Sequence, residues 1–108
     1  MLRSKDWPYY IDQEIMVHKD LILQNMSDVY QINFDEYKKQ EWFKVSVSSM
    51  RINRSGLFVK CRIKAFFIET KQSKYEGTYD ISVEKERYFS FRYSKCTIVL
   101  VKELENVA

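Results

Sequence analysis

From residue 42 onward, apolar and polar side chains alternate along the chain with a period of two. Apolar residues occupy the odd positions from 43 to 47 and from 57 to 67, and Lys, Arg or Ser fill most of the even positions between them. Successive side chains of a β-strand point to opposite sides, so this pattern is typical of strands that turn one face toward a core. It predicts two antiparallel strands that are joined near Gly56.

The length of the connecting loop decides which side chains face each other. A loop of two or four residues would put Val47 on the same face as Arg62. A three-residue loop, residues 54–56, instead pairs Val47 with Ile63 and gathers the apolar residues on one side. Glycine adopts positive φ without steric cost, which suits the last position of such a loop. We therefore expect a three-residue loop that ends in Gly56 at positive φ.

Further strands are predicted toward the C-terminus. Alternation over residues 78–84 and 88–93 indicates two more strands, and the charged residues 85–87 are interpreted as the loop between them. A bulge or a turn at residues 94–95 and a strand over residues 96–101 complete this half of the chain.

The N-terminal third fits two interpretations. One is an amphipathic helix whose apolar stripe contains Trp7, Ile11, Ile15, His18, Ile22 and Met26. The other is a pair of short strands at residues 15–17 and 21–23. Alternation over residues 30–34 predicts one more strand in either case.

These patterns together predict the fold class. With 108 residues, the chain is long enough for one domain, residues 1–108. Its two glycines and one proline leave Asn, Asp, Ser and Lys to build most turns. We expect a mainly β protein, an antiparallel β-sandwich or small barrel of about five to seven strands, with at most one N-terminal helix.

Membrane and secreted classes are disfavoured. The longest strongly apolar runs, residues 65–68 and 98–101, are far shorter than the roughly 20 residues that span a bilayer, and the charged N-terminus does not resemble a signal peptide. Cys61 and Cys96 are too few and too far apart for a disulfide framework or a metal clip. We expect reduced thiols, a cytoplasmic location and no membrane contact.

Enzymatic chemistry finds little support in the sequence. One histidine, two cysteines and two glycines leave no metal-ligand spacing, no nucleophile signature and no phosphate-binding loop. We interpret His18 as a partly buried side chain on the inner face of its element. Glu69 and Lys71, with Glu41 expected opposite Glu69, could hold Mg²⁺, but we interpret them as a charged strand end. No catalytic residue, metal or cofactor is predicted.

A basic segment occupies the middle of the chain. Residues 42–75 contain eight Lys or Arg and one acidic residue, whereas both flanks are acidic. Basic heads about 7 Å apart on the outward face of the hairpin, with aromatic neighbours, resemble a surface for single-stranded nucleic acid. The ordinary alternative is a solvated face whose cations pair with Asp80 and Glu84 on the next strand.

Aromatic residues make up 16% of the chain. Trp7, Tyr9, Tyr10, Tyr37 and Trp42 lie among polar neighbours, and such residues dominate protein-binding hot spots. The open edges of a sheet also favour homo-oligomers. We predict a small, non-enzymatic protein-binding domain, an accessory or inhibitor protein of the kind that phages and bacteria encode. A single-stranded nucleic-acid-binding domain is the alternative, and the candidate binding residues are Lys44, Phe58, Lys60, Arg62, Lys64, Phe66, Trp42 and Trp7.

Overall fold

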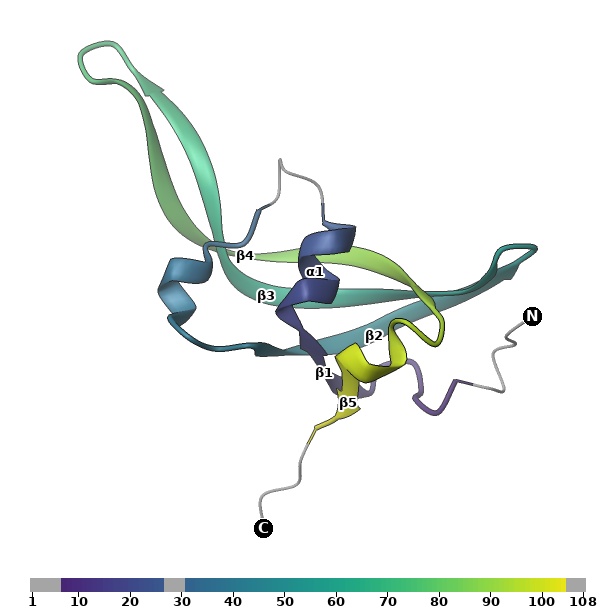
Figure 1. Cartoon of the computed structure of the whole chain (residues 1–108). Coiled ribbons are helices and arrows are strands. Elements are labelled where there is room, and N and C mark those ends of the chain that lie inside the picture. Colours follow the sequence, from purple (N-terminus) through teal and green to yellow (C-terminus); the bar gives the residue numbers. More distant parts are fainter. Residues whose placement is uncertain (1–6, 27–30, 105–108) are drawn as a thin grey trace.

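One five-stranded antiparallel sheet dominates the computed structural model, which describes residues 7–26 and 31–104 (Figure 1). The strand order is β4-β3-β2-β1-β5. The elements are β1 (Glu14–His18), α1 (Lys19–Asn25), the 3-10 helix η3 (Phe34–Tyr37), β2 (Trp42–Asn53), β3 (Gly56–Ser73), β4 (Gly77–Tyr93), the 3-10 helix η4 (Ile98–Leu100) and β5 (Val101–Glu103). The mainly β, antiparallel prediction is confirmed. The expected sandwich or barrel is not found, because the described strands form a single open sheet.

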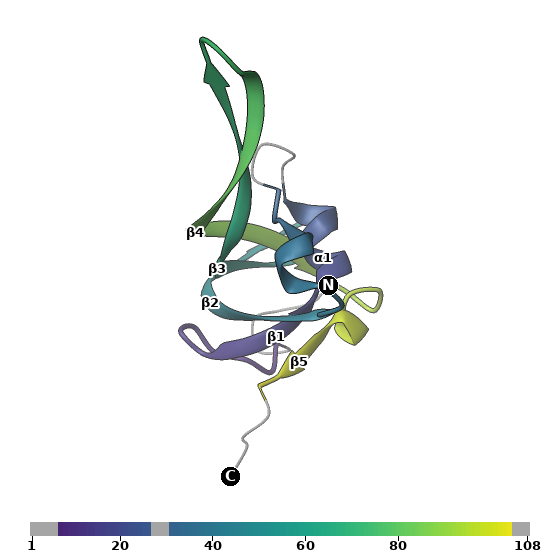
Figure 2. The ribbon, with the colours of Figure 1, turned by 90° about the vertical axis from the view of Figure 1, so that its left-hand side faces the viewer.

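Helix α1 and irregular segments, rather than a second sheet, cover the apolar face. Figure 2 shows α1 on one side of the strands. Leu21 and Ile22 of α1 are buried, together with Trp7, which lies edge-on to Tyr93 at a centroid distance of 4.8 Å. No helix within the described segments is long and apolar enough to cross a membrane.

The N-terminal third contains both a strand and a helix. Ile15 and Val17 of β1 alternate into the core. His18 ends the strand and caps α1, because its Nδ1 accepts a hydrogen bond from the Asp20 backbone N–H at 3.1 Å. Each earlier interpretation was therefore right for part of the segment.

The β2–β3 hairpin corrects the predicted register. Asn53 pairs with Gly56, so the loop has two residues, and an irregularity at Ser48 makes Val47 pair with Cys61 instead of Ile63. The extra residue in β2 has the effect that we assigned to a third loop residue, because it keeps both apolar sets on the core face. It also turns Ser49 and Arg51 outward and Met50 toward the core. Uninterrupted alternation from Val47 would place each of them on the opposite side.

Strand β4 is continuous, so the loop predicted at residues 85–87 is wrong. It pairs with β3 without a register shift from Leu57↔Tyr93 to Ser73↔Gly77. Lys85 and Arg87 belong to the core-facing set, where charge is usually costly. Lys85 forms an ion pair with Glu69, and Arg87 lies over the Phe67 ring at 5.9 Å, so both charges are accommodated.

Two further predictions require correction. The strand expected at residues 96–101 is largely η4, and β5 begins only at Val101. The preceding turn is confirmed, and the Ser94 N–H donates to Thr97 Oγ1 at 2.8 Å. Of the strand expected at residues 30–34, Ile32 forms an isolated bridge with Phe67 and Phe34 begins η3, while Tyr30 lies outside the described residues.

The ends of β3 and β4 form an arm, residues 68–82, that projects from the sheet (Figure 1). The registered pairing of β2 with β3 ends at Ser46↔Arg62. Near this divergence, the Phe66 N–H donates to the Tyr37 hydroxyl oxygen at 2.8 Å, and Ile32 bridges Phe67. Beyond these contacts, β3 and β4 pair with each other to the turn at residues 74–76.

Gly56 provides a test of the hairpin. Its φ is +127°, as the positive-φ prediction required, and an added Cβ would lie 3.3 Å from Arg92 Nε. Gly77 also has positive φ, +75°, but no atom lies within 4 Å of its Cβ position. We expect Gly77→Ala to lower the free energy of unfolding by about 1 kcal/mol through backbone strain, and Gly56→Ala to lower it further because Arg92 must also move. Urea unfolding measures both, and equal losses would contradict the close approach of Arg92.

Candidate functional site

The sheet face opposite α1 carries no described helix, and we call it the open face (Figure 2). The strand registers assign it side chains from all five strands. Outside the arm, its charged members are seven cations and three carboxylates, a balance of 7 − 3 = +4. They are Lys44, Arg51, Lys60, Arg62, Lys64, Arg92 and Lys102, with Glu14, Glu84 and Glu86.

Cations on β3 lean diagonally toward β4. Lys64 Nζ lies 3.7 Å from Glu84 Oε1, and Arg62 Nε lies 3.7 Å from Glu86 Oε1. In each pair, the carboxylate comes two positions before the β4 residue that is directly opposite. Along the same diagonal, Lys60 contacts the ring of Tyr88, and Lys60 Nζ lies 4.9 Å from the ring centroid. Lys60 therefore meets a ring where its two neighbours on β3 meet carboxylates.

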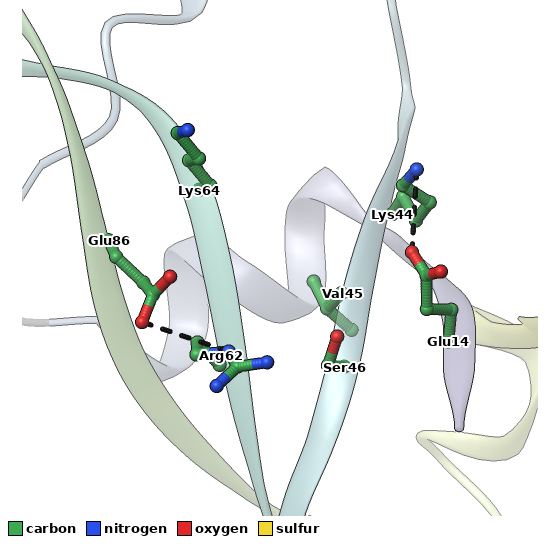
Figure 3. A pocket seen from close by; sticks show the side chains of 7 residues that line it. All are labelled: Glu14, Lys44, Val45, Ser46, Arg62, Lys64 and Glu86. Atoms are coloured by element: carbon green, nitrogen blue, oxygen red, sulfur yellow. Dashed lines mark ion pairs between the residues drawn. The ribbon is translucent and has the colours of Figure 1, made fainter. Parts of the chain in front are cut away.

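The middle of the open face is electrically balanced. Lys44 Nζ lies 3.4 Å from Glu14 Oε2, and with the two diagonal pairs this gives three cations against three carboxylates. We call these six residues the ion-paired band. Figure 3 shows Glu14 beside Lys44 and Glu86 beside Arg62 around a depression where β2 and β3 diverge. Exposed pairs of this kind contribute at most about 1 kcal/mol each.

A second depression lies on the open face toward the β2–β3 hairpin, and none of the residues that line it carries a carboxylate. It is lined by Ser49, Arg51, Phe58, Lys60 and Ser90. Phe58 pairs in register with Arg51 on one side and Arg92 on the other, and Arg51 Cζ lies 5.9 Å from its ring centroid.

These residues form a cationic patch: Ser49, Arg51, Phe58, Lys60, Tyr88, Ser90 and Arg92. Across the described ranges, 7–26 and 31–104, Arg51, Lys60 and Arg92 form no ion pair with a carboxylate. The patch therefore combines three uncompensated charges with two rings and two serine hydroxyls.

The predicted binding residues divide among different surroundings. Phe58 and Lys60 belong to the cationic patch, whereas Lys44, Arg62 and Lys64 belong to the ion-paired band. Trp42 lies at the far end of the open face, with Lys102 Nζ 4.2 Å from its ring centroid. Phe66 is half-buried where β2 and β3 diverge.

Trp7 is the exception, because only 4% of its surface is exposed. It is a core residue, and its selection as a binding residue was wrong. Of the other aromatic residues expected at a surface, Tyr10 is 75% exposed, and Tyr37 packs against Phe43 at a centroid distance of 4.9 Å.

Sequence reasoning missed Ser49, Arg51, Tyr88, Ser90 and Arg92. The even positions of β4 could have been recognised, because Tyr88, Ser90 and Arg92 alternate with buried Phe89, Phe91 and Tyr93. Arg51 carried no such signal. Simple alternation from Val47 assigns it to the core side, and only the irregularity at Ser48 turns it outward.

Outside the open face, the titratable groups with shifted pKa values in the described part of the chain are explained by packing and ion pairing. Burial raises the pKa of the Cys61 thiol to about 12, which keeps it protonated at neutral pH. Hydrogen bonds from Lys85 and Lys71 lower the pKa of Glu69, which pairs in register with Ile81. The registered pairing of β2 with β3 ends at Ser46↔Arg62, so the predicted pairing of Glu41 with Glu69 is wrong. Among the described residues, no three His, Cys, Asp or Glu side chains gather to hold a metal.

Comparisons with protein-family models, curated proteins and solved structures find no match to this chain. Its function is therefore inferred from the chemistry of the open face.

Charge reversal on β3 tests the division between the patch and the band. Lys64→Glu would face Glu84, and we expect it to lower the free energy of unfolding by about 0.5–1 kcal/mol. Lys60→Glu would lie beside Tyr88 and among cations, so it should leave stability unchanged or raise it slightly. Urea unfolding at low salt compares the two variants. The difference should shrink in about 1 M salt, where screening is strong, and equal effects at low salt would contradict the division.

Proposed function

We propose that this protein is a non-enzymatic binding domain that holds single-stranded nucleic acid against its cationic patch. The observation that carries this proposal is the set of three cations without carboxylate partners around two aromatic rings on an exposed sheet face. Phosphates supply the negative charge that the patch lacks, and unpaired bases can stack on exposed rings.

The arrangement of the patch favours a single strand over a duplex. Phe58 and Tyr88 belong to the surface of a sheet, with Tyr88 49% exposed. Bases within a duplex are stacked on one another and cannot reach such rings, whereas bases of a single strand can. The hydroxyls of Ser49 and Ser90, which flank Lys60 in register, add hydrogen-bonding groups beside the phosphate track.

A protein partner fits the patch less well. The centres of protein interfaces are depleted in lysine and in charge generally. A protein that covered Arg51, Lys60 and Arg92 would have to supply carboxylates, or leave three cations desolvated without partners. A nucleic acid supplies one negative charge per nucleotide without any special sequence.

The proposal is tested by charge reversal with a matched control. Lys60→Glu/Arg92→Glu changes two patch residues, and Lys39→Glu/Lys74→Glu makes the same charge change at exposed residues outside the open face. We expect the patch variant to lose at least about tenfold in affinity for a labelled oligothymidine of about twelve nucleotides, and the control to lose much less. Fluorescence anisotropy measures both.

Salt dependence provides the second measurement. Three phosphate contacts on a single strand predict a slope of about −2 for log affinity against log salt, which is about a 20-fold loss from 50 to 200 mM. Circular dichroism checks that each variant is folded. If the wild-type protein shows no salt-sensitive binding to single strands, the proposed function is wrong.

A protein partner remains the second candidate, and the arm is the observation that favours it. Tyr75 at its tip is 95% exposed and Tyr79 is 41% exposed. Two-stranded ribbons are marginally stable on their own, so a projecting ribbon with exposed tyrosines is suited to pack against another protein.

We expect Tyr75→Ser/Tyr79→Ser to abolish capture of a protein partner from nuclease-treated lysate, while Lys60→Glu/Arg92→Glu retains it. Pull-down with each immobilised variant measures this difference. Equal capture by wild-type protein and the arm variant, or capture that nuclease removes, would count against the arm as a protein-binding element.

A further inference from the structure

The cationic patch borders the ion-paired band along β3. Lys60, Arg62 and Lys64 follow one another on the same strand and the same face, about 7 Å apart. On charge alone they would form one continuous track for phosphates. Their diagonal neighbours on β4 differ, because Lys60 meets a ring and the next two cations meet Glu86 and Glu84.

We propose that Glu84 and Glu86 end the nucleic-acid track, so that the site engages about three phosphates, one for each uncompensated cation. This inference rests on the proposed function. It concerns the extent of the site and makes the two glutamates determinants of which ligands the protein can hold, although neither of them contacts the ligand.

Electrostatics provides the reason for a sharp boundary. A phosphate that approached Arg62 would have to displace Glu86, whose Oε1 lies 3.7 Å from Arg62 Nε. The displaced carboxylate would then lie beside the phosphate, and two like charges at such short range repel each other. The same holds for Lys64 and Glu84, so a strand gains little by extending past Lys60.

The dimensions of the cationic patch agree with a short footprint. Its three cations lie in two rows of side chains on three strands, the row Arg51, Phe58, Arg92 and the row Ser49, Lys60, Ser90, and Tyr88 lies in the next row, opposite Arg62. Rows on one face are about 7 Å apart and neighbouring strands are about 4.8 Å apart, so the two rows that hold the cations extend roughly 7 × 10 Å. We therefore infer that the ligand is a short single-stranded segment of about three nucleotides.

The experiment removes the two carboxylates and keeps their shape. Glu84→Gln/Glu86→Gln frees Arg62 and Lys64 for phosphates, and Glu36→Gln/Glu76→Gln is the control, with the same change in net charge at exposed residues outside the open face. Glu84 and Glu86 are about half exposed, and exposed ion pairs contribute little to stability, so the variant should fold. Circular dichroism confirms folding.

Salt slopes for 5′-phosphorylated oligothymidines of about three nucleotides, which carry about three phosphates, and of about twelve nucleotides are the measurement. For the wild-type protein and the control, we expect about −2 with both lengths. For Glu84→Gln/Glu86→Gln we expect about −2 with the short probe and about −3.5 with the long probe, because two more phosphates are engaged. Glu86→Gln alone should give an intermediate slope with the long probe.

The outcomes separate the two proposals. If the wild-type protein binds neither probe, the proposed function is wrong and the boundary falls with it. If it binds, but its slope with the long probe is already near −3.5, or the double glutamine variant does not steepen that slope, the boundary is wrong while the binding function stands.

Discussion

The uninterrupted pairing of β3 with β4 is the constraint on which the rest of the structure depends. All 17 residues of β4 pair with β3, from Gly77 to Tyr93, without a shift in register. A strand alternates its side chains strictly, so this one register assigns every odd residue of β4 to the core side and every even residue to the open face. One irregularity in this ribbon would exchange the core-side and open-face residues in the part of the strand beyond it.

The twist of the ribbon adds a second consequence. Side chains on the open face meet their diagonal neighbours, and the pairs Lys60 with Tyr88, Arg62 with Glu86 and Lys64 with Glu84 all share the same offset. Arg92 lies over Gly56 on this same diagonal. The residues at even positions of β4 therefore decide which cations of β3 are neutralised. Two glutamates followed by a tyrosine place the electrical boundary between Arg62 and Lys60.

The parts of the fold that were predictable from sequence are those that depend on local alternation. The core-facing set of β3, such as Val59, Cys61 and Ile63, follows from period two alone. Positive φ at Gly56 was predicted from a three-residue loop, and the structure has it directly after a two-residue loop. The irregularity at Ser48 was not predictable in this way, because it lies in a run of two small polar residues that fit either face. It nevertheless decides that Arg51 joins the open face.

The continuity of β4 was not predicted because it depends on contacts between residues that are distant in sequence. Lys85 and Arg87 read as a loop, since charges rarely belong to a core-facing set. Their partners, Glu69 and the Phe67 ring, belong to β3, and no local sequence pattern indicates these contacts. Trp7 was misassigned for a related reason, because its burial depends on Tyr93, which is close in space but distant in sequence.

The composition of the open face also explains why no described segment forms a second layer against it. A sandwich would bury the even positions of β3 and β4, and unpaired charges are costly to remove from water. The charged residues at these positions include Lys60, Arg62, Lys64, Glu84, Glu86 and Arg92. The sequence that predicted a charged outward face therefore argued against the sandwich that we expected. A cover for the cationic patch must bring its own negative charge, and it must offset the cost of removing the cations from water. A polyanion meets both requirements, because counterions are released when its phosphates are neutralised, and this offsets the cost of desolvating the cations.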